Sequence, residues 1–321
     1  MLAHVARRLL LAIPLVLGVL LLTFLLVELA PGDTCDNIIS DNMTPALIAM
    51  LRAQWGCDEP AWVRLLFVLR NLASFNLGES AFSHRPVASL IADALPHTLV
   101  LSLVTLFFAQ VFGVTVGVVQ AVRQFRFSDS LLSVVTLVFY SMPPFLLAIS
   151  LQLVFSLWWP VLPSTLPTSI MAEFMGPWDQ LVDRLKHVVL PGMAMGLAAA
   201  AGDARYMRSS MVEVIRQDFV RTARAKGLPE WKVVVKHALR NALLPTVTLL
   251  GLNLPYLFGG SLLIERVFSW PGMGTLIYGA IGVQDTPVLM ACFYVYALMV
   301  VAGGVLSDLL YAMVDPRIRF S

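Results

Sequence analysis

The sequence predicts an all-α integral membrane protein with six transmembrane helices. Hydrophobic residues make up 58% of the 321 residues, charged residues only 13%, and the mean hydropathy is +0.80. A soluble domain is about a quarter charged. The apolar residues form continuous runs of the length, about 20 residues, that a helix needs to cross a bilayer core of about 30 Å. A transmembrane barrel would instead show short alternating segments.

Six apolar runs underlie this prediction. They are residues 9–29, 96–120, 130–159, 188–207, 242–264 and 287–312. The first run is longer than the apolar region of a signal peptide, which spans about 7–15 residues, so we expect an uncleaved first span. The fourth run is the weakest, because it is rich in Gly and Ala. Pairs of glycines four residues apart are typical of close helix contacts; they are Gly113 and Gly117, and Gly192 and Gly196.

The distribution of basic residues predicts that both termini lie in the cytoplasm. With the N-terminus inside, 15 of the 22 Lys and Arg residues fall on the cytoplasmic side and 7 outside. Cytoplasmic loops carry the excess of Lys and Arg, and the opposite orientation reverses this count. The net charge of +2 does not suggest a nucleic-acid partner. The chain then divides into a tail and first span (1–30), an extracytoplasmic segment (31–95) and a membrane core (96–321) with a cytoplasmic hairpin at about 208–241.

The extracytoplasmic segment contains two stretches with helical apolar spacing, MTPALIAMLRAQWG and PAWVRLLFVLRNLASF. We expect a small helical insertion there, lying over the outer mouth. Cys35 and Cys57 both fall in it, and an oxidising exterior favours a disulfide between them; the alternative is two unpaired cysteines. Cys292, in the sixth run, is expected to be a packing residue.

The segment from Asp218 to Pro245, DFVRTARAKGLPEWKVVVKHALRNALLP, is the most informative part of the chain. Nine basic and three acidic residues lie between Arg205 and Arg240. Gly227 and Pro229 interrupt the helical pattern, since glycine often ends a helix and proline suits the start of the next. The pattern predicts a helix, a tight turn and a second helix. A broken apolar stripe at helical spacing runs through the segment and consists of Phe219-Val220, Ala223, Leu228, Trp231, Val234-Val235 and Leu239. Composition alone allows two roles, an anchor on anionic lipid or a docking element for a soluble partner.

The residue pattern of this segment favours docking to a soluble partner. FVRTARAKGL followed by KHALRNALLP resembles the cytoplasmic loop of ABC-importer permeases of the dipeptide/oligopeptide/nickel family, B-type. The general importer pattern is EAA, three residues, Gly, nine residues, then I-x-L-P. Aligned on Gly227, this chain has Arg221-Thr222-Ala223 in place of EAA and HALR at 237–240 in place of I-x-L-P. Other motifs similar to that family occur in order: LAPGD, YSMPPF, RSSMVEV, ERVFSWPGMG and DLLYAMVDPRIR.

The resemblance implies a type I ABC-importer permease fold in a bacterial inner membrane, with the hairpin seated in a groove of an ATPase subunit. Implied partners are a second permease, one or two ATPase subunits that hold ATP and Mg, an extracytoplasmic solute-binding protein and membrane lipid. The chain itself is expected to bind no cofactor. The candidate coupling residues are Arg221, Thr222, Ala223, Arg224, Ala225, Lys226, Gly227 and Leu228. For each single arginine, the alternative is a solvated helix face.

Two breaks in long apolar runs are candidates for lining a translocation path, since irregular backbone at membrane depth is tolerated where it lines a cavity or is buried in protein. They are Pro143-Pro144 and the GLNLPY run at 251–256, and the candidate residues are Ser141, Met142, Asn253 and Tyr256. The alternative is a packing kink with Asn253 bonded to a neighbouring helix. For Asp203 and Asp308, in the fourth and sixth runs, we expect ion pairs with nearby basic residues.

An enzyme is not expected, because the sequence lacks GxxxxGK[ST], HExxH, GxSxG and SxxK motifs and its five histidines are scattered. The sequence therefore favours a permease subunit of an ATP-driven importer for peptides or a related small solute. The alternative is a stand-alone secondary transporter or channel, which paired buried charges in several spans would favour. Such charges are sparse here.

Overall fold

The computed structural model describes residues 2–30, 44–46, 48–50, 58–243 and 262–314, and the side chains of 2–7, 9 and 307–314 are not described. Within these residues the regular structure is helical, apart from an isolated bridge between Glu79 and Pro86. The chain forms two compact units, one made of residues 1–98 and 271–302 and the other of residues 99–270 and 303–321.

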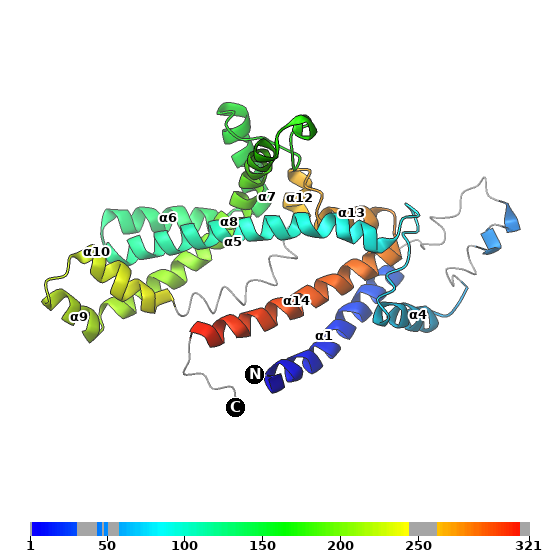
Figure 1. The fold of residues 1–321 in the computed structure, drawn as a ribbon, viewed down its shortest axis with the longest axis horizontal. Helices are drawn as coiled ribbons and strands as arrows, with labels where there is room; N and C mark the ends of the chain where they lie inside the picture. Colours follow the sequence, from blue (N-terminus) through cyan, green and yellow to red (C-terminus); the bar gives the residue numbers. More distant parts are fainter. Residues whose placement is uncertain (1, 31–43, 47, 51–57, 244–261, 315–321) are drawn as a thin grey trace. The chain divides into compact units, whose positions relative to one another are not determined.

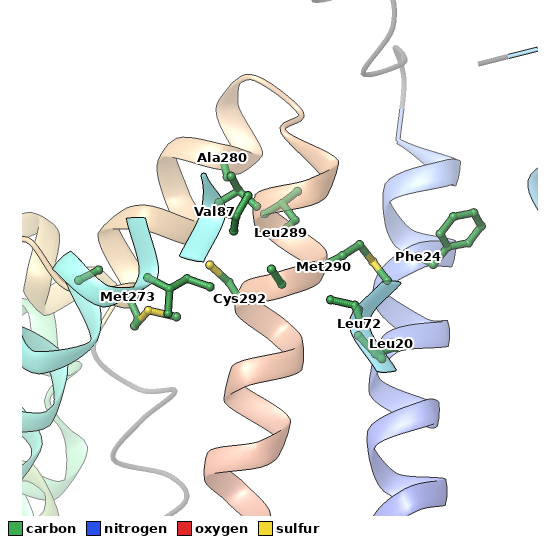
Figure 2. Close-up of a cluster of buried hydrophobic side chains, with 13 residues drawn as sticks. Leu20, Phe24, Leu72, Val87, Met273, Ala280, Leu289, Met290 and Cys292 are labelled. Atoms are coloured by element: carbon green, nitrogen blue, oxygen red, sulfur yellow. The ribbon is translucent and has the colours of Figure 1, made fainter. Parts of the chain in front are cut away.

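The first unit is built around the first and last long helices. Its elements are α1 (Leu2–Leu29), α4 (Ala61–Ala73), the start of α5 (Val87–Val122), α13 (Met273–Gly282) and most of α14 (Thr286–Val314). A buried apolar cluster joins them and includes Leu20, Leu72, Val87, Met290 and Cys292 (Figure 2). Cys292 is therefore a packing residue, as expected.

A buried carboxylate, Asp285, fixes the beginning of α14 in this unit. Its Oδ2 accepts a hydrogen bond from the Ser80 hydroxyl at 2.5 Å, and its Oδ1 accepts from the backbone N–H of Ala81 at 3.2 Å and of Val288 at 3.4 Å. Asp285 thus caps α14 and holds the residues that precede α5 against it. No motif in the sequence marks this residue in advance.

The second unit centres on the long helix α8 (Pro177–Ile215). The other elements are the rest of α5, α6 (Phe127–Ser141), α7 (Pro144–Gln152) continued by η1 (Leu153–Trp158), η2 (Ala172–Phe174), α9 (Asp218–Ala225), α10 (Glu230–Lys232) continued by η3 (Val233–Leu239), and α12 (Leu262–Val267). Figure 1 shows α9 and α10 at one end of this unit, and α7 and α12 away from them.

The paired glycines form the contact between α5 and α8. A Cβ atom at Gly196 would lie 2.6 Å from the Cβ of Phe108, and one at Gly113 would lie 2.6 Å from the Cβ of Asp203. Gly117 and Gly192 are equally crowded by the facing helix. The expectation of close glycine contacts is confirmed, since no larger side chain fits between these backbones.

Four described helices are long and apolar enough to span a membrane: Leu10–Leu29, Val87–Val122, Pro177–Ile215 and Thr286–Leu306. A fifth span is formed if α6 and the α7–η1 segment count together, with a bend of 107° between them. The bend follows from the sequence, because a residue before proline is pushed to extended backbone. Met142 and Pro143 both adopt it, with ψ of 129° and 133°. The remaining predicted run, 242–264, lies mostly outside the described residues.

Several helices are longer than the apolar runs that predicted them, α5 and α8 most clearly. α5 begins at Val87, before Pro96, and α8 begins at Pro177, before Val188. Hydropathy marks the part of a helix that lies in lipid, whereas the backbone hydrogen bonding continues into polar residues at either end.

Candidate functional site

The basic segment folds as a helix, a turn and a second helix, as its glycine and proline indicated. α9 ends at Ala225, and Gly227 follows with φ of +73°, a left-handed conformation that glycine adopts without a Cβ penalty. Its N–H donates to the carbonyl of Arg224 at 2.9 Å, which closes the last turn of α9. Pro229 directly precedes α10 and brings extended backbone into it, with ψ of 143°.

The hairpin, defined here as residues 218–239, packs firmly on the end of α8. Val220 and Ala223 of α9 and Val233, Val234 and Ala238 of the second helix are all buried. They share one apolar cluster with Met207, Met211 and Val214 of α8 and with Ala121 of α5. The Ser210 hydroxyl also donates to the carbonyl of Ala242 at 2.9 Å, just after the hairpin. The hairpin is therefore packed against the end of α8 and is not a loosely attached loop.

An ion pair joins the two helices of the hairpin at its tip. The Arg224 guanidinium donates to both carboxylate oxygens of Glu230, at 2.7 and 3.1 Å. These hydrogen bonds hold the pKa of Glu230 below its usual range. Arg224 is one of the candidate coupling residues, and in this structure its guanidinium is engaged within the hairpin itself.

The other candidate coupling residues divide between two faces. Ala223 is buried and Leu228 is half-buried, so their side chains pack inward. The exposed candidates are Arg221, Thr222, Ala225, Lys226 and Gly227. Arg221 lies 3.5 Å from Asp218, a long contact between two exposed side chains that leaves the guanidinium open to solvent.

Three apolar side chains of the expected stripe are instead exposed. Trp231 is 64% exposed, Val235 54% and Phe219 39%. The Lys232 ammonium lies over the Trp231 ring at 5.5 Å from its centroid. Only part of the broken stripe packs inward, because the neighbouring residues Phe219 and Val220, and Val234 and Val235, cannot share one helix face. The outer face of the hairpin is therefore both basic and aromatic.

A second ion pair, between Asp129 and Arg208, joins α6 to α8 close to the part of α8 that contacts the hairpin. Arg208 donates to both Asp129 oxygens, at 2.9 and 3.1 Å, and the N–H of Phe125 adds a third bond at 3.0 Å. Asp129 is buried in the first turn of α6. Its position is typical of a helix start, but its partner 79 residues away has no sequence signal.

The expected ion pair of Asp203 is not formed. Asp203 is buried between α5 and α8, and its carboxylate accepts a hydrogen bond from the Gln110 amide at 2.8 Å. Arg205 lies elsewhere, with its guanidinium 5.2 Å from the centroid of the Tyr140 ring. Residues two apart on a helix point in different directions, so proximity in sequence was a poor guide.

The candidate path residues are only partly described. Ser141 is exposed and Met142 half-buried, at the bend between α6 and α7. Asn253 and Tyr256 lie outside the described residues, as do Cys35 and Cys57 and the side chain of Asp308. In the described part of the chain, no three His, Cys, Asp or Glu side chains come together as they would around a metal ion.

Comparison with known proteins agrees with the resemblance of the motifs. Residues 113–320 match the family described as "Binding-protein-dependent transport system inner membrane component". The chain is 38% identical to the dipeptide transport system permease protein DppB of Alkalihalophilus pseudofirmus, with 100% of both chains covered. It is 36% identical to the oligopeptide transport system permease protein AppB of Bacillus subtilis, and 37% identical to the glutathione transport system permease protein GsiC of Salmonella typhimurium, again over 100% of each chain.

The fold is also similar to a solved one. A chain of the MetNI methionine ABC transporter, in an inward-facing conformation, superposes with a TM-score of 0.54 at 22% identity. The match covers 72% of this chain and 98% of that chain. The family match and the full-length relatives lead to one conclusion: the chain belongs to the binding-protein-dependent ABC-importer permeases, in their dipeptide and oligopeptide branch.

Proposed function

We propose that the chain forms half of the translocation path of an ATP-driven importer for peptides or a related small solute. In this proposal it crosses a bacterial inner membrane six times with both termini in the cytoplasm. It pairs with a second permease and receives substrate from an extracytoplasmic solute-binding protein. One or two ATPase subunits, which hold ATP and Mg, engage the segment from Asp218 to Pro245.

The observation that carries this proposal is the two-sided construction of the hairpin. Its inner face, with Val220, Ala223 and Val233, is buried against α8, whereas its outer face exposes Trp231 and several basic side chains. An anchor on anionic lipid needs basic residues, but it does not need a buried inner face or an ion pair that joins the two helices at the tip. A protein that receives force needs a firm base and a fixed outer surface, and interface surfaces are enriched in aromatic residues and Arg.

A stand-alone secondary transporter is the alternative, and the described residues favour it less. Proton and ion relays need several ionisable groups facing each other at membrane depth. In the described spans, the buried Asp203 has the neutral amide of Gln110 as its partner. The relatives named as transport system permeases also support a multi-subunit importer.

The test replaces Gly227 with Val in the assembled transporter. A Cβ at Gly227 would meet no atom within 4 Å, so the change acts through the backbone, whose φ of +73° strains a β-branched residue. We expect the chain to insert in the membrane while substrate uptake is lost. We also expect ATP hydrolysis to lose its stimulation by the substrate-loaded binding protein.

Gly78 supplies a matched control. It has the same φ of +73° and equally open space, but it lies in the first unit, ahead of α5. Gly78→Val should therefore carry the same strain without loss of coupling. Uptake at the wild-type rate by Gly227→Val would refute the coupling role. Uptake that an ion gradient sustains without the ATPases would favour the secondary transporter instead.

A further inference from the structure

Helix α4, in the segment after the first span, is apolar on both of its faces. Its inner face contributes a row at helical spacing to the buried cluster of the first unit; the row is Leu65, Val68, Leu69 and Leu72. Its outer face exposes Trp62 (65%), Leu66 (58%) and Phe67 (61%). A helix that lies on a protein surface in water carries polar residues on its outward face. This outer face is instead mainly aromatic and aliphatic.

The charges of α4 are few and all basic. They are Arg64 and Arg70, and the helix has no acidic residue. Arg64, in the first turn of α4, forms an ion pair with Glu28 in the last turn of α1. Arg70 is exposed, and its long side chain allows the guanidinium to reach a headgroup phosphate while its aliphatic part stays among apolar groups.

Contacts at the two ends of α4 fix the direction in which it runs along α1. The Arg64–Glu28 pair places its first turn at the outer end of the first span. Leu72, in its last turn, belongs to the same buried cluster as Leu20, and both are labelled in Figure 2. Leu20 precedes Glu28 by eight residues in α1, and Arg64 precedes Leu72 by eight residues in α4. α4 therefore runs from the end of the first span back toward its middle, over about 12 Å of its own length at 1.5 Å per residue.

We propose that α4 is inserted obliquely into the outer leaflet of the membrane, with Trp62, Leu66 and Phe67 in contact with phospholipid. The expectation of helices over the outer mouth is thereby changed, because the register against α1 places α4 beside the span. α1 also exposes Leu22 and Leu26, between Leu20 and Glu28, so both helices present apolar side chains outward at this level. Trp62, near the level of Glu28, has the depth at which tryptophan is enriched in membrane proteins.

The inference rests on the proposed topology for its choice of leaflet, but not for the contact with lipid. The reason is that the register is measured against α1 itself, which is a span in either orientation. The lipid contact and the side of the membrane are therefore separate questions, and separate experiments answer them.

The lipid contact is tested by photo-crosslinking in the assembled transporter. A photoreactive phenylalanine analogue replaces Leu66 or Phe67 in separate variants, reconstituted in vesicles of phosphatidylethanolamine and phosphatidylglycerol. We expect irradiation to add the mass of one phospholipid to the chain. The same analogue at Leu69, on the inner face, should crosslink within the chain, and at Lys226, on the hairpin turn, should give no lipid adduct. Adducts at 66 and 67 with the second permease or the binding protein, or adducts with neither lipid nor protein, would overturn the proposal.

The leaflet is tested in intact cells with a cysteine at Glu79, an exposed residue between α4 and α5. Cys35, Cys57 and Cys292 are first replaced by serine or alanine. A membrane-impermeant maleimide should label Glu79→Cys from outside. Labelling from the cytoplasmic side alone would refute the proposed topology and the outer-leaflet placement, while lipid adducts at Phe67 would still show an inserted helix.

Discussion

The contact between α5 and α8 allows a quantitative prediction from one methyl group. Replacing Gly196 with Ala puts a Cβ 2.6 Å from the Cβ of Phe108 and 2.9 Å from the carbonyl oxygen of Thr105. The first distance is 0.8 Å shorter than 3.4 Å, where ordinary van der Waals contact begins. Neither neighbour is the far end of a flexible side chain, so the two helices must move apart. A Cβ at Gly202, on the same helix, would meet no atom within 4 Å, so Gly202→Ala serves as the matched control.

The magnitude follows from two opposing effects. Overpacking a filled helix contact costs about 1–3 kcal/mol, and Gly→Ala within a helix contributes up to about 1 kcal/mol of stability. Gly202→Ala keeps the second effect alone, whereas Gly196→Ala has both. The free energies of unfolding of the two variants should therefore differ by about 1–3 kcal/mol, with Gly196→Ala the less stable.

The assay compares thermal unfolding midpoints of the purified transporter that carries each variant, in one detergent and at one concentration. At about 2–4 °C per kcal/mol, the two midpoints should differ by about 2–12 °C. Membrane transporters often unfold irreversibly, so a fixed heating rate is needed for the comparison. Equal midpoints for Gly196→Ala and Gly202→Ala would refute the argument that the glycine contact holds α5 against α8.

Three further predictions concern the hairpin and its base. Glu230→Ala should reduce uptake and leave folding almost unchanged, since an exposed ion pair contributes less than about 1 kcal/mol; the double variant Arg224→Glu with Glu230→Arg should restore uptake, and failure to do so would exclude the ion pair as the cause. Trp231→Ala should weaken binding of the ATPase subunits by about tenfold or more, as exposed aromatics at interfaces often do, and unchanged binding in a pull-down titration would exclude this face. Asp129→Asn should destabilise the chain by about 1–2 kcal/mol through the loss of charged hydrogen bonds from Arg208. Equal unfolding midpoints for Asp129→Asn and the wild type would exclude a stabilising role for this ion pair.

The features that sequence predicted well depend on local rules. The apolar runs predicted the membrane helices because a bilayer sets their length. Pro143-Pro144 predicted the break between α6 and α7 because proline restricts the residue before it. Gly227 and Pro229 located the turn of the hairpin for a similar local reason: glycine can adopt a left-handed backbone, and proline fixes its own φ.

The features that sequence missed depend on partners far along the chain. Asp129 and Arg208 are 79 residues apart, and Ser80 and Asp285 are 205 apart. Neither pairing has a local pattern that specifies it. Arg224 shows the same difficulty at short range, because a basic residue in a helix does not reveal whether its guanidinium faces a partner protein or Glu230. The faces of Phe219 and Trp231 were settled by packing on α8, which sequence periodicity over so short a helix does not resolve.

Helix α8 contacts the hairpin, α6 and α5 at successive positions, and this order bears on how docked ATPase subunits would act on the membrane helices. Met211 and Val214, at one end of α8, hold the hairpin. The Arg208–Asp129 pair, about one turn earlier, holds α6, and Gly196, further along the same helix, holds α5. α8 is continuous over all of these contacts, from Pro177 to Ile215. A displacement of the hairpin by the proposed ATPase subunits would therefore move α8, α6 and the facing part of α5 together. The bend at Pro143-Pro144, where backbone hydrogen bonding is interrupted, is then the place in the described spans best suited to absorb the change in angle.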